Sequence, residues 1–208
     1  MVTIILYSRK TMVLIKILLY HYNCLRHAVI EIHAMVEMIL SSLWLMLPAY
    51  IANPTAVVCG GGTSIDFGKN FVDGKRILGD GKTYRGLAGG VICGVILGII
   101  QMNASLAGRF GGFTLLAVFS LSFGALLGDM CNSFIKRRLG FKRGAKFMIA
   151  DQLDFVIGAW ALTYLLQGSW FIEHFTATTM IIILIITPVL HRITNLIGYH
   201  VKLKKEPW

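Results

Sequence analysis

Charged side chains are scarce in this sequence, and their scarcity excludes most soluble folds. Only 14% of the 208 residues are Asp, Glu, Lys or Arg, whereas a soluble domain usually carries about 25%. The mean hydropathy is +0.70, and 56% of the residues are hydrophobic. Long stretches carry no charge at all, and the charges are bunched between them. This pattern is typical of membrane spans joined by short polar loops.

The sequence also lacks a cysteine pattern that could hold a zinc ion or a disulfide framework. Its four cysteines lie far apart and form no C-x-x-C pair. Cys93 and Cys131 lie inside apolar stretches, where a free thiol behaves as a small hydrophobe. We therefore expect neither disulfides nor a zinc site.

A P-loop is missing as well, although glycine-rich loops are present. In the loop of residues 60–69, a Walker A motif would need glycine where Thr63 stands and Ser or Thr where Asn70 follows the lysine. The G-K-T of residues 81–83 fails too, because Arg76 occupies the first-glycine position. Backbone N–H groups of a glycine-rich loop can still wrap phosphates or a base. The candidate residues of the first loop are Gly60, Gly61, Gly62, Asp66 and Lys69.

Five hydrophobic segments are each close to the ~20 residues that cross ~30 Å of hydrocarbon. They cover residues 35–58, 87–103, 113–135, 147–167 and 177–201. The sequence therefore predicts an all-α, polytopic membrane protein with about five transmembrane helices, whose cytoplasmic loops form the site. Asn53-Pro54 predicts a kink or an end in the first span. Residues 1–34 form an N-terminal extension to the domain of residues 35–208, with an extra span or an interfacial helix as alternatives.

Lys and Arg are concentrated in alternate loops. Residues 66–85, residues 136–146 and the tail after the fifth span hold most of them, whereas the connections 104–112 and 167–176 share only Arg109. Five spans place the basic segments on one side of the membrane, and the positive-inside rule assigns that side to the cytoplasm. We expect a multi-pass protein of the cell membrane with its C-terminus inside. Topology then explains the net charge of +10, so a nucleic-acid partner is not expected.

All six aspartates lie in the two basic loops or at the span ends beside them. Carboxylates within membrane segments are costly and usually functional. Asp151 and Asp154 share one face of the fourth span, and Asp129 begins a polar face on the third. The short connection makes these spans antiparallel neighbours, so the three carboxylates can converge at the membrane boundary. They are the predicted catalytic and metal-binding residues, because Mg²⁺ binds through carboxylates and substrate phosphates.

The polar face of the third span continues with an amide, a hydroxyl and an ammonium group. Asn132, Ser133 and Lys136 follow Asp129 at the i+3, i+4 and i+7 positions. Lys136 is therefore a fourth candidate for the catalytic set. In the alternative interpretation, the carboxylates only form salt bridges with the adjacent basic loop. On the fifth span, His191 and Arg192 could contact a lipid phosphate or face a polar cavity.

Residues on the third and fourth spans carry a family resemblance. The S-F-I-K-R of residues 133–137, followed by the D-Q-L-D of residues 151–154, resembles the signature of CDP-diacylglycerol synthases, S-x-hydrophobic-K-R to D-R-hydrophobic-D. The K-T-Y-R-G of residues 82–86 is similar to their K-T-W-E-G element. Gln152 departs from this signature, and the His-Gly-Gly segment is absent. Arg143 or Lys146 could replace the missing arginine at a phosphate.

The chain resembles archaeal CDP-archaeol synthases more closely, over about residues 35–208. The matching motifs are Asn53-Pro54, the triple glycine, residues 65–70, 79–83 and 191–195, and the Pro207-Trp208 ending. The resemblance implies Mg²⁺-dependent transfer of a cytidylyl group from CTP to unsaturated archaetidic acid (2,3-bis-O-geranylgeranylglycerol 1-phosphate), an isoprenoid glycerol ether phosphate. The products would be the CDP-activated lipid and pyrophosphate.

The resemblance also implies roles for individual side chains. Asp129, Asp151 and Asp154 would hold Mg²⁺. Cations would neutralise the triphosphate, and the first glycine-rich loop would hold cytidine. The nucleotide-binding residues that we expect are Gly60, Gly61, Gly62, Asp66, Lys69, Asp80, Lys82, Thr83, Arg85, Asn132, Ser133 and Arg137.

Two other classes of protein fit less well. A CDP-alcohol phosphotransferase needs D-G-x2-A-R-x8-G-x3-D-x3-D. From Asp80 the chain tracks this pattern only partway, reaching Arg85 and Gly94, and the last two carboxylates would fall at Gly98 and Met102. A small transporter would place charges near the bilayer midplane, often between repeated halves. The sequence shows no internal repeat, and its charges gather at one surface.

Overall fold

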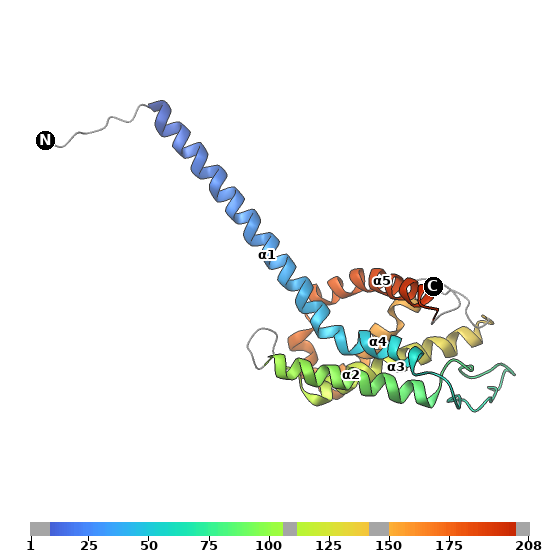
Figure 1. The fold of residues 1–208 in the computed structure, drawn as a ribbon. Helices are drawn as coiled ribbons and strands as arrows, with labels where there is room; N and C mark the ends of the chain where they lie inside the picture. The colour runs from blue at the N-terminus through green and yellow to red at the C-terminus, as the bar shows by residue number, and fades with distance from the viewer. Residues whose placement is uncertain (1–8, 106–111, 142–149, 203–208) are drawn as a thin grey trace. The chain divides into compact units, whose positions relative to one another are not determined.

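The computed structural model describes residues 9–105, 112–141 and 150–202. These residues form five helices and no β-strand, and each helix is long and apolar enough to cross a membrane. The predicted all-α, multi-span fold class is confirmed (Figure 1). The helices are α1 (Arg9–Val58), α2 (Tyr84–Ser105), α3 (Leu115–Arg138), α4 (Ala150–His174) and α5 (Ala177–His200). Arg109, Arg143, Lys146 and the Pro207-Trp208 ending lie outside the described residues.

Helix α1 differs most from the prediction. It begins at Arg9 instead of near residue 35, and it continues past Asn53-Pro54 to Val58. A proline inside a helix removes one backbone hydrogen bond, which here does not end the helix. Residues 1–40 and 41–208 form two separate compact units. The candidate span in α1 covers 47 residues, about twice what one crossing requires.

Glycines let α2 lie against both α1 and α3 within the second unit. Gly86, Gly90, Gly94 and Gly98 recur every four residues and so share one face of α2. A Cβ atom on Gly90 would lie 2.6 Å from the carbonyl oxygen of Ala52 in α1, and one on Gly98 would lie 2.0 Å from Val118 Cγ1 in α3. Small residues allow such close contact between helices in lipid.

Helices α3 and α4 also pack closely, next to the predicted carboxylate cluster. A Cβ atom on Gly128 would lie 2.1 Å from the carbonyl oxygen of Asp154, and one on Gly158 would lie 2.4 Å from the carbonyl oxygen of Gly124. The backbones of the two helices are therefore in direct contact. This contact brings the residue after Gly128, which is Asp129, to the same end of the bundle as Asp154.

Buried hydroxyl groups join helices inside the apolar core of the second unit. Ser120 of α3 donates a hydrogen bond of 3.0 Å to Thr163 of α4. The hydroxyls of Tyr50 in α1 and Thr187 in α5 lie 2.7 Å apart. Such bonds hold helices together where water is absent. The fully buried core residues around them include Met46, Leu121, Val156 and Ile183.

Helix α4 is interrupted near its C-terminal end. Gln167 has non-helical backbone angles (φ −144°, ψ 59°), and the helix resumes to His174. The predicted fourth span ends at this residue. Thr114, which caps the start of α3, donates a hydrogen bond of 2.6 Å to Gln167 Oε1. The polar side chain of Gln167 thus ties the interruption in α4 to the start of α3.

Candidate active site

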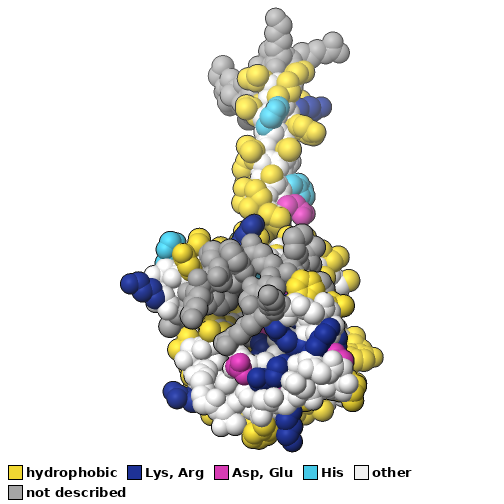
Figure 2. All heavy atoms as spheres, turned by 90° about the vertical axis from the view of Figure 1, so that its right-hand side faces the viewer, with side chains coloured by type: hydrophobic (Ala, Val, Ile, Leu, Met, Phe, Trp, Pro, Cys, Tyr) yellow, Lys and Arg dark blue, Asp and Glu magenta, His cyan; other side chains and the backbone are white. Residues whose placement is uncertain are grey.

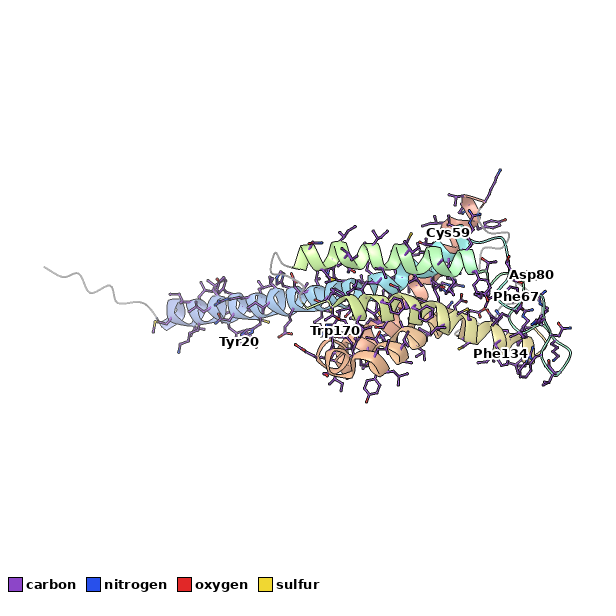
Figure 3. All side chains as sticks on the ribbon, turned by 90° about the horizontal axis from the view of Figure 1, so that it is seen from below. Tyr20, Cys59, Phe67, Asp80, Phe134 and Trp170 are labelled. Carbon is purple, nitrogen blue, oxygen red and sulfur yellow. The ribbon has the colours of Figure 1, made fainter. Side chains whose placement is uncertain are left out.

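The loop of residues 59–83 and the ends of α3 and α4 meet at one end of the second unit. Phe67, Asp80 and Phe134 lie at this end, whereas Trp170 lies toward the other (Figure 3). Figure 2 shows this end face-on, with Lys and Arg side chains gathered beside acidic ones. The charge clustering that the sequence predicts is therefore present in space.

Asn132 connects the two carboxylates of α4. Its amide nitrogen donates hydrogen bonds of 2.7 Å to Asp151 Oδ1 and to Asp154 Oδ2, and the residue is only 7% exposed. Lys136, one turn further along α3, donates to both carboxylate oxygens of Asp151 at 3.0 and 2.9 Å. The predicted polar faces of the third and fourth spans do meet, because the glycines beside them allow close packing.

Lys82 brings the loop to the third carboxylate. Its ammonium group forms an ion pair with Asp129 in which both side chains are about three-quarters buried. The pair joins the segment before α2 to the same face of α3 that carries Asn132. Ion pairs required by the salt-bridge interpretation are therefore present, at Asp129 and at Asp151.

The donor chemistry of this cluster fits a hard divalent cation. In the described part of the chain, no three Asp, Glu, His or Cys side chains converge as a ligand set. Lys82, Asn132 and Lys136 lie among the carboxylates instead. Mg²⁺ usually takes only one or two carboxylates from a protein and completes its shell with water and substrate phosphate. A site that needs only one or two carboxylates is compatible with this cluster, in which lysines lie between the carboxylates.

Asp66 organises the loop from inside. It accepts hydrogen bonds from the backbone N–H groups of Gly68 (3.1 Å), Leu78 (3.0 Å) and Gly79 (2.8 Å) and from the guanidinium of Arg76 (2.7 Å). Burial by itself would raise the pKa of Asp66, but these hydrogen bonds together hold it well below its ordinary value. All of these contacts lie within the loop, so the nucleotide contact expected of Asp66 stays a prediction.

Other predicted nucleotide-binding residues have different surroundings. Thr83 is buried, and its hydroxyl accepts the N–H of Gly86 at 3.1 Å, which caps the start of α2. Asp80 pairs with Arg76 at 2.7 Å. Among the residues it describes, the structure gives no side-chain hydrogen bond or ion pair for the exposed Lys69 and Arg85, which leaves their cationic groups accessible to a ligand.

The remaining predicted residues lie around these groups. Gly61 and Gly62 have positive φ angles of 107° and 74°, a conformation that favours glycine, and Gly60 precedes them. Arg137 donates to the carbonyl of Phe141 at 2.8 Å. Ser133 is half-buried on α3.

The fifth helix approaches the cluster through one aromatic contact. The ring of His191 lies 6.2 Å from that of Phe155, the residue after Asp154. Arg192 beside it is exposed. Contact with a lipid phosphate and a polar cavity both stay predictions for this pair.

Sequence reasoning missed two arginines that shape the site. In the sequence, Arg76 is only one of several loop cations, and Arg138 is only part of the basic stretch of residues 136–146. Arg76 bonds to Asp66, and Arg138 contacts the backbone of residues 75 and 76. Their partners depend on how the loop folds back, and no local spacing encodes that.

Fold and site together define a polytopic membrane enzyme with a charged site at one end of its helices. The model of the CarS-like CDP-archaeol synthase family matches residues 35–208. The chain is 50% identical to the CDP-archaeol synthase of Methanosarcina mazei over 175 residues and 54% identical to that of Methanoregula boonei over 167 residues. Each match covers 78% of this chain and all of the relative.

A solved structure gives the same result. It is described as an intramembrane enzyme for archaeal membrane lipids biosynthesis, and its TM-score to this chain is 0.64 at 39% identity, over 76% of this chain and 94% of the other. The chain belongs to the CDP-archaeol synthase family. It is a nucleotidyltransferase that transfers a cytidylyl group from CTP in archaeal lipid synthesis, in a family that is generally metal-dependent. The phosphotransferase and transporter alternatives are thereby set aside.

Proposed function

We propose that this chain transfers the cytidylyl group from CTP to unsaturated archaetidic acid with Mg²⁺, at the cytoplasmic end of its spans. The observation that carries this proposal is the cluster in which Asn132 joins Asp151 to Asp154, with Lys136 beside it. Lys82 adds a second cation at Asp129. Carboxylates for a metal and cations for phosphates therefore lie within one small region.

The ligands for Mg²⁺ would come from the carboxylates Asp129, Asp151 and Asp154, of which Mg²⁺ usually takes only one or two. The metal, when bound, would screen the negative charge of the triphosphate. Lys82 and Lys136 now balance the carboxylates. In the complex they are free to turn to the triphosphate, since a metal would take over the carboxylate charge.

The reaction itself needs little acid–base chemistry. An oxygen of the lipid phosphate attacks the α-phosphorus of CTP, and the bond from that phosphorus to the β-phosphate oxygen breaks, releasing pyrophosphate. The attacking oxygen is already anionic, so no strong general base is required. Lys82, Lys136, Arg85 and Arg137 promote the transfer by holding the phosphates in line and neutralising the leaving group.

The loop of residues 59–83 holds the nucleoside. The exposed backbone at Gly61 and Gly62 is open to a ligand, because a Cβ atom at either glycine would meet nothing within 4 Å. Lys69 is exposed on the same loop. Asp66 keeps the loop in shape through its internal hydrogen bonds. Asp80, Thr83 and Ser133 complete the nucleotide-binding set that we propose.

The lipid tails stay in the bilayer while the headgroup phosphate reaches the charged end of the helices. Apolar side chains cover the outer faces of the spans, including Ile92, Ile96 and Ile185, each more than half exposed. The positive-inside rule, applied to the basic segments, supports a cytoplasmic position for this end. CTP is water-soluble and meets the lipid phosphate there.

The decisive experiment removes the charge of one carboxylate. Asp154→Asn keeps the size of the side chain but removes its anionic charge, so we expect CDP-lipid formation to be abolished in purified protein that still folds. Glu173→Gln is the matched control, because Glu173 is exposed near the other end of the same helix. Near-normal turnover of the Asp154 variant, with labelled CTP and the lipid phosphate, would remove Asp154 from the site.

Orientation has its own test. Single cysteines at Val72 and at Thr176, both exposed, can be labelled in intact vesicles with a thiol reagent that does not cross membranes. We expect the reagent to reach Thr176 from outside and Val72 only after the vesicles are opened. The reverse pattern would place the site on the outer face.

A further inference from the structure

Arg138, the last residue of α3, uses its side chain to bind backbone carbonyl groups of the loop of residues 59–83. Its Nη2 atom donates to the carbonyl oxygen of Lys75 at 3.2 Å and also to that of Arg76. Lys75 returns a hydrogen bond of 2.9 Å to the carbonyl oxygen of Arg138. Asp73, in the same turn, forms an ion pair of 3.1 Å with Arg138. One side chain thus makes three polar contacts with a single turn of the loop.

Two aromatic rings surround the same guanidinium. Phe71 of the loop and Phe134 of α3 meet edge to face, with centroids 5.3 Å apart at 89°. The guanidinium carbon of Arg138 lies 4.8 Å from each centroid. This is a cation–π arrangement, and only a planar guanidinium can stack on rings while its edge donates to carbonyls.

The contacts at Arg138 continue into the rest of the loop. Arg76, whose carbonyl Arg138 holds, uses its own guanidinium to bond Asp66 at 2.7 Å. Asp66 in turn holds the N–H groups of Leu78 and Gly79. Hydrogen bonds therefore connect Arg138 at the end of α3 to Arg76, and Arg76 to Asp66 at the centre of the loop.

The loop has a second attachment to α3, the ion pair of Lys82 with Asp129. Asp129 and Arg138 are nine residues apart, which is about 14 Å along a helix. Two attachments at this spacing fix both the position of the loop and its rotation about Lys82. With only the Lys82 attachment, the glycine-rich segment could swing away from the carboxylates.

We propose that Arg138 is a positioning residue that docks the loop on α3 and so sets the affinity of the enzyme for CTP without touching the nucleotide. The proposal rests on the proposed function, because it takes the loop as the nucleoside-binding part of the site. Binding needs the docked loop, and an enzyme docked only a fraction f of the time has its apparent dissociation constant raised by 1/f.

The kinetic test uses Arg138→Lys, which keeps the charge and loses the planar fork. We expect the KM for CTP to rise about tenfold, as for a loop docked a tenth of the time, while the KM for the lipid phosphate stays unchanged. Phe71→Leu should act in the same direction from the loop side without altering α3. Val72→Ala is the matched control, because Val72 is 93% exposed in the same turn. A fully active lysine variant would overturn the proposal, since a mere cation would then suffice.

Limited trypsin digestion of the detergent-solubilised protein measures how well the loop is docked on α3, independently of enzyme activity. Trypsin cuts after both Lys and Arg, so Arg138→Lys leaves the number of sites unchanged, and Lys69 and Lys75 offer exposed sites in the loop. We expect faster cleavage of the loop in Arg138→Lys and Phe71→Leu, but not in Val72→Ala. Unchanged cleavage, or faster cleavage with an unchanged KM for CTP, would overturn the positioning role. If the wild-type protein formed no CDP-lipid, the proposed function would fail instead, and digestion would still report on the contact.

Discussion

A single methyl group on Gly128 should separate the two helices that carry the site. A Cβ atom there would lie 2.1 Å from the carbonyl oxygen of Asp154, whereas ordinary contacts begin near 3.4 Å. The obstructing atom is backbone, so no side chain can rotate away. Gly128→Ala therefore requires α3 and α4 to move apart locally by about 1.3 Å, the difference between these two distances.

That movement is larger than the lengthening that a hydrogen bond tolerates. The amide of Asn132 reaches Asp151 and Asp154 across the same interface at 2.7 Å. Adding the separation gives about 4 Å, which is beyond hydrogen-bond reach. A misplacement of about 1 Å can cost about 10²-fold in rate, whereas overpacking a core usually costs only about 1–3 kcal/mol in stability. We expect a folded enzyme with roughly a hundredth of its activity.

Gly168→Ala is the control, because a Cβ atom there would meet nothing closer than Tyr164 Cε2 at 3.9 Å. Incorporation of labelled CTP into lipid gives the activity, and gel filtration in detergent shows whether each variant is folded. If Gly128→Ala and Gly168→Ala were equally active, the close packing of α3 on α4 would not set the geometry of the site.

Three further outcomes can be checked on the same preparation. Asp66→Asn should lower the unfolding temperature at neutral pH. Because hydrogen bonds depress the pKa of Asp66, the difference in unfolding temperature between wild type and variant should persist at every pH above the ordinary aspartate pKa of 3.8 and be lost only at lower pH. Lys136→Ala should weaken CTP binding in a titration, since it removes a cation placed for the triphosphate, and unchanged affinity would assign Lys136 to topology. EDTA should stop CDP-lipid formation, and added Mg²⁺ should restore it better than Ca²⁺, because the smaller ion binds phosphates through few protein carboxylates.

The sequence predicts the spans and the charged faces well because both follow from local rules. Apolar segments of about 20 residues predict helices, and helical spacing puts Asn132 on the face of Asp129. Close packing of α3 on α4 then needs only small residues at the contact, and Gly124, Gly128 and Gly158 provide them. The meeting of the two polar faces could therefore be expected from sequence.

The interior of the loop could not be expected in the same way. Asp66 bonds to residues as far away as Gly79, thirteen positions along the chain, and Arg138 bonds to residues 62 and 63 positions before it. Such pairs depend on where the chain turns back, and several glycines with positive φ decide that, including Gly68 and Gly74. Hydrophobic periodicity carries no information on these turns, so the sequence does not predict the contacts of Arg76 and Arg138 within them.

The pair of Lys82 and Asp129 allows the site to be tested against the simpler interpretation, in which the carboxylates only form salt bridges. Lys82→Met leaves a largely buried carboxylate without its cation, which should cost about 1–3 kcal/mol of stability. Lys82→Met combined with Asp129→Asn removes both charges, and the stability should largely return, because a neutral pair needs no partner.

The two interpretations then differ in activity. If the pair serves only structure, the double variant should recover turnover together with its unfolding temperature. If Asp129 supplies a metal ligand and Lys82 neutralises phosphate, the double variant should be folded and inactive, because neither a neutral amide nor a thioether can replace these charges. Thermal unfolding in detergent and labelled CTP turnover, measured on the two single variants and the double variant, distinguish these results. A stable, active double variant would leave the carboxylate of Asp129 without a role in the chemistry.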